Sequence, residues 1–503
     1  MQTIGDALGF YDLATLGALC GGLLLGFAVG AIPGVSSSTA VAIILPISIG
    51  MDVHTALIFM AGVYCGGQYG GAPPAILLNT PGESGAAVTA LDGYPMTRRG
   101  EGARALAIAR VASGVGGVLA AILVMTLFAP LSDVLLEFGA PEMFVVAVLG
   151  LSLISSIGSS DVLKGLLAAS SGALVSLMAA DPILGSPRVT FGIDELYDDF
   201  PFVPVLIGLF GISELAMLVR RGRVTDLGAQ PRFDLRAEAA QIGAGFRDVL
   251  TRPLQTVRGS LIGMFVGIIP GAGSSISNFI AYGLAKRFSR RPETFGTGNP
   301  EGIIAAESSD NGVTAGAMVP TFGFGVPGSA TTAVMLSAML LHGIDPGPRV
   351  LTDSAPLVYS VLLGILFASI LTIPLGTVLS SVMLRLVTIP VQYLVPGVLI
   401  IATMGTYSFR ESAFDVLLLP VFGALGYVLR RHGYPVVAFV MGLILGPIAE
   451  GNFNRALRIS GDDWSVFVES PITWVLWAAT LAIILLGPIS RWRSGRRTRI
   501  GAP

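Results

Sequence analysis

The sequence predicts an all-α membrane protein that crosses the bilayer many times and consists of two repeats of opposite orientation. Three observations favour this fold. Apolar residues make up 53% of the 503-residue chain and charged residues only 12%, whereas soluble domains carry about 25% charged residues. Apolar runs recur from end to end, long enough to cross roughly 30 Å of hydrocarbon as helices. Two Pro-Gly spacings each occur twice, in the same order.

Other fold classes fit the composition poorly. The apolar runs are continuous and do not alternate with polar residues, so a β-barrel is disfavoured. A net charge of −2 gives no indication of nucleic-acid binding, and Cys20 and Cys65 form no metal-binding or disulfide pattern. The first 97 residues contain no Lys or Arg, so a cleavable signal is not expected and the first apolar run should remain in the mature protein.

The two repeated spacings predict a duplicated unit. The chain reads G-x3-G-x3-G-x2-P-G from Gly22 to Gly34, and the same spacing returns 237 residues later from Gly259 to Gly271. It reads G-x3-P-x6-P-G from Gly70 to Gly82, and again 246 residues later from Gly316 to Gly328. Two ordered matches at nearly equal offsets indicate an internal repeat.

The distribution of Lys and Arg predicts that the repeats face opposite ways. When basic clusters such as Arg98 to Arg110 and Arg491 to Arg499 are placed in the cytoplasm, the alternation of spans inverts between the halves. Inverted repeats are typical of secondary transporters. The predicted organisation is a first repeat at 1–220, with a hairpin at 17–50 and a broken segment at 55–97, a cytoplasmic linker at 221–258, a second repeat at 259–450, with a hairpin at 259–285 and a broken segment at 301–342, and an extra helix with a basic cytoplasmic tail at 451–503.

About 11 to 12 transmembrane segments are expected. The arm from Gly259 to Ile269 would reach only about 16 Å, which favours a re-entrant hairpin there, while the longer first element leaves a pair of full spans open. The protein is expected in a bacterial inner membrane, with its N-terminus periplasmic and its C-terminus cytoplasmic. The remaining full spans are predicted near 107–129, 142–158, 162–180, 201–219, 356–384, 388–404, 413–429, 435–449 and 472–490.

The Pro-Gly breaks are the predicted binding site. A helix that begins mid-membrane presents free N–H groups and the positive end of its dipole, which suits an anion, and freed carbonyls on the other side suit Na⁺. Packing remains the alternative for any single serine, and a membrane-edge cap remains one for the acids. The candidate substrate-binding residues are Pro33, Gly34, Ser36, Ser37, Ser38, Asn79, Thr80, Pro81, Gly82, Pro270, Gly271, Gly273, Ser274, Ser275, Pro327, Gly328 and Ser329. The candidate coupling-ion residues are Glu83, Asn278, Glu307, Asp310, Asn311 and Thr331.

Enzyme classes lack the necessary motifs. Lys164 and Lys286 are the only lysines, so no GxxxxGK[ST] loop exists, and there is no HExxH sequence. The sequence therefore favours a secondary active transporter with no cofactor other than Na⁺ as a coupling ion, or with a proton in its place. An ion channel or a membrane scaffold without transport activity is the alternative.

Five stretches resemble the large membrane subunit of the tripartite tricarboxylate transporter family. They read GLLLGFAVGAIPG, YGGAPPAILLNTPGESGAA with LDGYPMTRRGEGARA, GMFVGIIPGAGSSI, NPEGIIAAESSDNGVTAGAMVPTFGFGVPGSATTAV and LHGIDPGP. The resemblance implies an ion-gradient-driven carrier for citrate-like carboxylates, of elevator type by analogy. It implies two partners, a small membrane subunit of about four spans and a periplasmic substrate-binding protein. A homodimer is compatible with it. Asp310 stands where the family commonly has a small residue or asparagine, so a strict assignment to citrate is not made.

Overall fold

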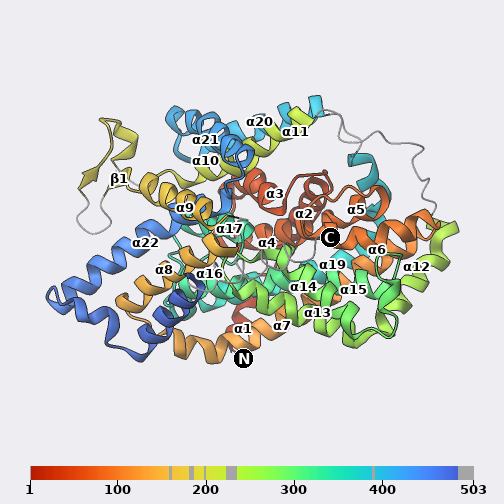
Figure 1. The fold of residues 1–503 in the computed structure, drawn as a ribbon. Coiled ribbons are helices and arrows are strands. Elements are labelled where there is room, and N and C mark those ends of the chain that lie inside the picture. Colours follow the sequence, from red (N-terminus) through yellow and green to blue (C-terminus); the bar gives the residue numbers. More distant parts are fainter. Residues whose placement is uncertain are drawn as a thin grey trace, which may run out of the picture. The chain divides into compact units, whose positions relative to one another are not determined.

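The computed structural model describes residues 2–157, 161–180, 186–197, 200–221, 235–387 and 391–484. They divide into two compact units, Met1–Ser132 with Phe202–Tyr427, and Asp133–Pro201 with Val428–Pro503. Figure 1 shows that almost all of the chain is helical. The all-α class predicted from the composition is therefore confirmed.

The first unit holds every Pro-Gly break. Its N-terminal part consists of α1 (Gln2–Leu8), α2 (Leu13–Gly30), α3 (Ser37–Ile44), the 3₁₀ helix η1 (Leu45–Gly50), α4 (Val53–Gly70), α5 (Ala72–Leu78), α6 (Ala86–Arg98) and α7 (Gly102–Leu135). Its later part consists of α10 (Phe202–Leu206), the π-helix η3 (Ile207–Ile212), α11 (Ser213–Arg221), α12 (Leu235–Leu250), α13 (Pro253–Ile268), α14 (Gly273–Phe288), η4 (Pro292–Thr294), α15 (Pro300–Gly316), α16 (Met318–Phe324), α17 (Ala330–Leu341), α18 (Val350–Asp353), α19 (Ala355–Val387), α20 (Val391–Arg410) and α21 (Ala413–Arg431).

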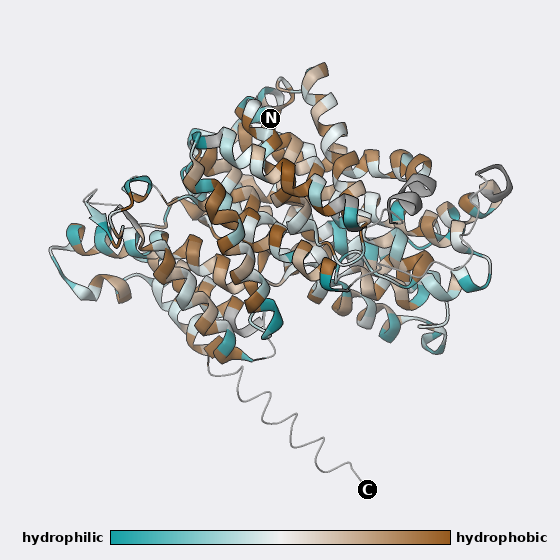
Figure 2. Cartoon of the chain, turned by 90° about the horizontal axis from the view of Figure 1, so that it is seen from above, coloured by the Kyte–Doolittle hydropathy of each residue, from teal (hydrophilic) through white to brown (hydrophobic). Residues whose placement is uncertain are grey.

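Long apolar helices account for part of the predicted spans, and residues 485–490 of the last predicted span lie outside the described residues. Within the described ranges, six helices are long and apolar enough to cross a membrane, and hydrophobic residues recur along the helices (Figure 2). The chain is therefore a multi-pass membrane protein. The six are Leu13–Gly30, Gly102–Leu135, Phe202–Arg220, Ala355–Leu379, Ala413–Arg431 and Val436–Ser460, and shorter apolar helices include Ala140–Ile154, Val162–Ser176, Val395–Ser408 and Pro471–Ile484.

Two helix pairs are joined by glycine stripes. A Cβ atom on Gly26 of α2 would lie 2.4 Å from the carbonyl oxygen of Val63 in α4. A Cβ atom on Gly263 of α13 would lie 2.2 Å from the carbonyl oxygen of Ser309 in α15. Each helix thus approaches its neighbour at backbone-to-backbone distance, which small residues make possible in membrane proteins. In Figure 1, α13, α14 and α15 lie side by side.

The chain turns back on itself after each glycine stripe. Gly34 and Gly271 adopt φ values of +83° and +75°, which glycine tolerates without steric cost. The Gly34 N–H donates to the Gly82 carbonyl at 3.2 Å, and the Gly271 N–H donates to the Gly328 carbonyl at 3.0 Å. The first Pro-Gly break of each half is therefore tied to the second break of the same half.

One arm is longer than the sequence predicts. Helix α13 begins at Pro253, whereas the apolar pattern places the start of this arm at Gly259. Proline fits the first helical position because it lacks only an N–H that would be unpaired there. Sixteen residues reach about 24 Å, so the arm exceeds half the bilayer thickness. Polar residues in its first two turns hid this extension from a pattern based on hydrophobicity.

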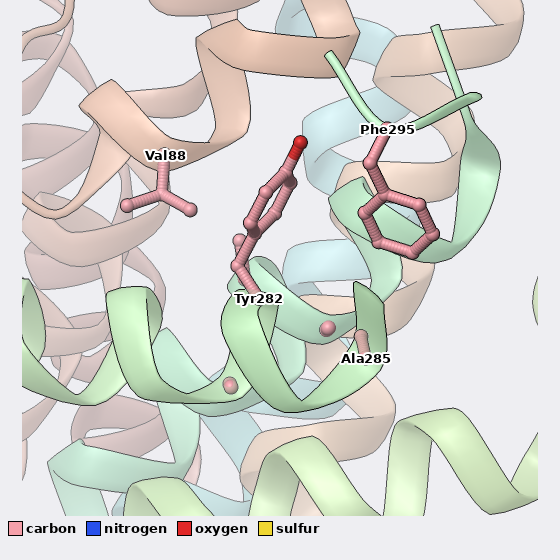
Figure 3. Close-up of a cluster of buried hydrophobic side chains, with 7 residues drawn as sticks. Val88, Tyr282, Ala285 and Phe295 are labelled. Atoms are coloured by element: carbon pink, nitrogen blue, oxygen red, sulfur yellow. The ribbon is translucent and has the colours of Figure 1, made fainter. Parts of the chain in front are cut away.

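The loop between α14 and α15 is anchored on α6 by the buried side chain of Asp92. Asp92 Oδ1 accepts from the backbone N–H groups of Gly296, Gly298 and Asn299 at 2.8–2.9 Å, and Oδ2 accepts from the Tyr282 hydroxyl at 2.9 Å. Next to it, Val88 of α6, Tyr282 and Ala285 of α14 and Phe295 of the loop converge in an apolar cluster (Figure 3). The sequence analysis did not single out these residues.

The second unit is a smaller helical group. It contains α8 (Ala140–Ile157), α9 (Val162–Ser176), a short antiparallel pair of strands β1 (Ala179–Ala180) and β2 (Pro187–Arg188), η2 (Asp194–Leu196), α22 (Val436–Ser460), η5 (Trp464–Val468) and the apolar helix Pro471–Ile484. Helices α9 and α22 pack so closely at Gly172 and Gly442 that a Cβ atom on either glycine would lie within 2 Å of a carbonyl oxygen of the other helix.

Candidate functional site

Glu83, in the loop between α5 and α6, lies at the centre of a polar cluster. Its Oε1 accepts from the hydroxyl of Ser37 at the start of α3, at 3.2 Å, and from the hydroxyl of Ser274 at the start of α14, at 3.3 Å. Ser37 and Ser274 occupy the same position of the repeated spacing, 237 residues apart. One carboxylate therefore joins the helix starts that follow two different Pro-Gly breaks.

Gln68 of α4 completes the ring of donors around Glu83. Its side-chain amide best satisfies its surroundings with the nitrogen directed at the carboxylate, where it donates to Oε2 at 2.8 Å and Oε1 at 2.9 Å. Gln68 is 3% exposed. Among the described residues, the side chains that donate to Glu83 are therefore neutral.

Asp310 forms a second polar centre next to the first. Its Oδ1 accepts from the Asn278 amide at 2.8 Å, and Asp310 interacts electrostatically with Glu83. Gly85 packs against three of these polar groups. A Cβ atom on Gly85 would lie 2.8 Å from Asn278 Nδ2, 2.9 Å from Ser274 Oγ and 3.0 Å from Asp310 Oδ1. The absence of a side chain at Gly85 therefore leaves these polar groups together.

The break before α17 reaches the same place. The Ser37 hydroxyl forms a 2.9 Å hydrogen bond with the hydroxyl of Thr331. Ser329 caps α17 by accepting from the Thr332 N–H, and its hydroxyl meets Tyr64 of α4 at 3.3 Å. Residues from all four breaks thus contribute to one buried polar region, which the sequence spacing alone did not establish.

Other predicted residues lie around this region without touching Glu83. Ser36 forms hydrogen bonds with Ser38 and Thr39, and Ser84 bonds to Ser275 at 2.5 Å. Thr39 Oγ1 also lies within hydrogen-bonding distance of the Phe210 carbonyl in the π-helix. The first break therefore also contacts η3, and π-helical turns frequently occur at functional sites.

Several predicted residues act through the backbone. Asn79 ends α5 with φ of 54°, and Gly325, 246 residues later, ends α16 with φ of 67°. Gly82 packs on the backbone, since a Cβ atom there would lie 2.2 Å from the Gly30 carbonyl oxygen. Gly273 has φ of +62°. The remaining predicted residues of this kind, which the structure places in or beside the turns, are Pro33, Gly34, Thr80, Pro81, Pro270, Gly271, Pro327 and Gly328.

Glu307 and Asn311 form no hydrogen bond with Glu83 among the described residues, although Glu307 interacts electrostatically with Glu83 and Asp310. Glu307 Oε1 accepts from the Thr89 hydroxyl at 2.5 Å, and Glu307 Oε2 has no hydrogen-bond partner among the described residues. Asn311 likewise has neither amide atom paired within the described part of the chain. The predicted coupling-ion residues therefore fall into two neighbouring groups.

Sequence reasoning missed Gln68, Tyr64, Gly85 and Thr89. Gln68 could have been found, because an amide near the end of an otherwise apolar helix is costly in lipid. Gly85 and Thr89 carry no such signal, since small residues pack throughout membrane helices. Their roles depend on which helices meet, which spacing does not show.

Comparison with known proteins identifies the family. The family model of the tripartite tricarboxylate transporter TctA family matches residues 16–441. The chain belongs to this family. TctA proteins are the large membrane component of a tripartite transporter, so the family resemblance predicted from the motifs is confirmed.

Two relatives come from Agrobacterium vitis. One is an uncharacterised 52.8 kDa protein in the TAR-I ttuC' 3' region, 35% identical over 475 residues, which cover 94% of this chain and 93% of that protein. The other is an uncharacterised protein in the TAR-II ttuC' 3' region, 33% identical over 234 residues, which cover 46% of this chain and 97% of that protein. No solved structure matches the chain.

Proposed function

We propose that this TctA protein is the transport subunit of a binding-protein-dependent carrier that imports tricarboxylates or related small carboxylates, driven by a gradient of Na⁺ or protons. The observation that carries the proposal is the position of Glu83, hydrogen-bonded to matched serines of two Pro-Gly breaks. Broken helices at membrane depth are tolerated where they line a cavity or are buried in protein. Their convergence on buried polar groups supports a transport site.

Matched contacts support two inverted repeats with re-entrant hairpins. Each half has a glycine-striped helix pair, a left-handed glycine after the first break, and a backbone hydrogen bond from that glycine to the second break. The last helices also correspond: Gly208 of η3 packs on the Leu419 carbonyl of α21, as Gly172 of α9 packs on the Phe439 carbonyl of α22. We infer that the repeats exchange their final helices.

The substrate site is proposed at the starts of α3, α14 and α17. Helices α3 and α14 begin directly after Pro-Gly turns, and Ser329 caps α17. Such helix starts favour a carboxylate through their N–H groups and dipoles. The residues proposed to bind substrate are those of the four breaks.

The coupling cation is proposed to bind between Asp310, Asn278 and Glu83. Asn278 Oδ1 is a buried acceptor without a partner among the described residues, and it lies beside the carboxylate that its amide nitrogen contacts. Carboxylate, amide and hydroxyl oxygens are hard ligands suited to Na⁺. Glu83 and Asp310 repel each other when both are ionised. A proton on one of them would relieve this repulsion, as a bound cation would.

The family implies the assembly. A small membrane subunit and a substrate-binding protein are the expected partners in the tripartite transporter. We further propose an inner-membrane location, a periplasmic N-terminus, a periplasmic binding protein and elevator-type movement of the breaks. The breaks all lie in one compact unit, which supports their moving together.

Uptake by vesicles reconstituted with both partners tests the proposal. Citrate uptake should require an imposed Na⁺ or proton gradient and should cease when both are collapsed. Ser37→Ala and Ser274→Ala should each lower uptake about tenfold or more, because each removes a hydrogen bond to the buried Glu83 carboxyl group. Ser337→Ala is the matched control, since this buried serine bonds only to its own helix. Uptake without a gradient, or unchanged uptake in both serine variants, would refute the proposal.

A further inference from the structure

Arg110 is an arginine buried inside the membrane unit. It belongs to a basic cluster predicted to be cytoplasmic, but it lies eight residues into α7 and is 2% exposed. Within the part of the chain that the structure describes, it forms no ion pair, and its Nε and Nη2 groups have no hydrogen-bond partner. A buried guanidinium without a counter-ion is costly, so ionisable residues at such positions mark functional sites.

Tyr69 of α4 is a second unpaired polar group beside Arg110. Its hydroxyl lies close to the guanidinium and interacts electrostatically with both Arg110 and Glu307, although it meets no group at hydrogen-bonding geometry among the described residues. Native proteins leave few buried polar atoms unpaired, and each needs an explanation such as a bound water or ion. A concentration of such atoms therefore indicates an unfilled polar site.

One face of α15 carries further unpaired polar groups. Glu307, Asn311 and Thr314 are spaced four and three residues apart, which places them on one side of the helix, and each carries an unpaired buried atom. Helices α7 and α15 touch where the Asn311 Cβ lies 3.3 Å from the position of a Cβ on Gly117. Ser113, one turn before Gly117 and also unpaired, lies on the same stripe.

The geometry of the free donors identifies the ligand class. Nε–H and one N–H of Nη2 point in parallel from the same edge of a guanidinium, and this edge binds a carboxylate through two hydrogen bonds. The Tyr69 hydroxyl beside it is a further donor. Glu307 Oε2 is an acceptor, which fits a hydroxyl or undissociated carboxyl group on the same ligand. Phe246 of α12 covers the guanidinium at 5.9 Å.

We propose that Arg110 and Tyr69 form a second carboxylate site, between α4 and α7, which holds one carboxylate of the transported acid after it leaves the Pro-Gly breaks. This inference rests on the proposed function, since it takes the ligand to be the transported acid. Arg110 is then a binding residue, and Phe246 closes its site on the side of α12.

Ligand binding to the purified complex of large and small subunits tests the site. Isothermal titration with citrate, and separately with succinate, should show a dissociation constant roughly 10- to 100-fold higher in Arg110→Gln than in the wild type. Arg110→Lys, which keeps the charge but loses the parallel donors, should weaken binding about tenfold. Arg98→Gln, at an exposed position at the end of α6, is the control and should bind as the wild type does.

Two outcomes would overturn the site. The first is that the wild type and Arg110→Lys bind citrate and succinate with equal affinity, or that neither protein binds either acid measurably. The second is recovery of wild-type affinity in the double variant Arg110→Gln/Glu307→Gln, since Arg110 would then only balance Glu307. If either result accompanies loss of uptake in Ser274→Ala, the second site is rejected while the proposed function stands. Unchanged uptake in the serine variants would reject the function itself.

Discussion

Gly85 illustrates how a residue without a side chain can shape a polar site. Adding a methyl group there would place a carbon 2.8–3.0 Å from Asn278, Ser274 and Asp310, closer than van der Waals contact permits. Gly85→Ala should therefore separate these groups and lower carboxylate uptake by tenfold or more while the protein still inserts. Vesicle uptake normalised to protein content measures this effect.

Gly283→Ala is the matched control for Gly85→Ala. Gly283 lies in α14, and no heavy atom lies within 4 Å of the position that a Cβ atom would take there. Alanine there should leave uptake unchanged and favour the helix slightly. Equal uptake in both alanine variants would show that Gly85 has no role in organising the cluster.

At the residue scale, the sequence identified the hydroxyls and acids but not their partners. Ser37, Ser274 and Glu83 were predicted because they follow Pro-Gly turns, and the structure brings these three together. Gln68 and Gly85 belong to the same cluster, yet nothing local distinguishes them from packing residues. Hydrogen bonds between residues about 190 positions apart, such as Ser274 to Glu83, depend on tertiary structure.

Helix pairs are the elements on which the site rests. Gly26→Ala should push α2 away from α4, and Gly263→Ala should push α13 away from α15. In each variant the new carbon would lie within 2.4 Å of a carbonyl oxygen of the neighbouring helix. The cost should be about 1–3 kcal/mol or more, seen as a lower thermal unfolding temperature in detergent. Gly21→Ala, one residue off the stripe with open space around it, should unfold as the wild type does. Similar unfolding of all three variants would contradict the close approach.

The loop clamp of α6 gives a second prediction for an element. Asp92→Ala removes the acceptor of three backbone N–H groups and one hydroxyl, and should cost about 3 kcal/mol or more because hydrogen bonds to charged groups are strong. Tyr282→Phe removes only one of these bonds and should cost less. The rate of limited proteolysis in the loop between α14 and α15 measures how far the loop is released from α6. Cleavage no faster in Asp92→Ala than in Tyr282→Phe would show that the loop is held by other contacts.

Element boundaries followed hydrophobicity where it was continuous. The span predicted at 413–429 corresponds to α21 (Ala413–Arg431), and that at 435–449 begins within one residue of α22 (Val436–Ser460). The start of α13 and the π-helical turn of η3 were not predicted. The first is hidden by polar residues, and the second depends on hydrogen-bond spacing that a period of 3.6 residues does not distinguish.

The whole molecule is predicted to place the two halves in opposite orientations. Single cysteines introduced as Gly50→Cys and Arg290→Cys, both at exposed positions, should react with a membrane-impermeant maleimide from opposite sides of the membrane. The native Cys20 and Cys65 are replaced beforehand. Labelling of both positions from the same side would contradict the inverted repeats. Arg98→Cys, also exposed, marks the side expected to be cytoplasmic.

For the whole chain, composition was enough to predict the membrane class, and motifs were enough to predict the family. The division into two compact units was not predicted, because the sequence was divided by repeat. Instead, Asp133–Pro201 and Val428–Pro503 form one unit, and all four Pro-Gly breaks belong to the other. Units assembled from distant segments follow from packing, and a repeat boundary read along the chain does not show them.

The bonds from Ser37 and Ser274 to a single carboxylate have a mechanical meaning. While both persist, α3 and α14 are linked through Glu83, and movement of one helix relative to the other must break at least one of these hydrogen bonds. A conformational change that opens the site to one side of the membrane must then move α3 and α14 together, or first break a hydrogen bond to Glu83. A ligand that binds Glu83 in place of Ser37 and Ser274 would free the two helices to move separately.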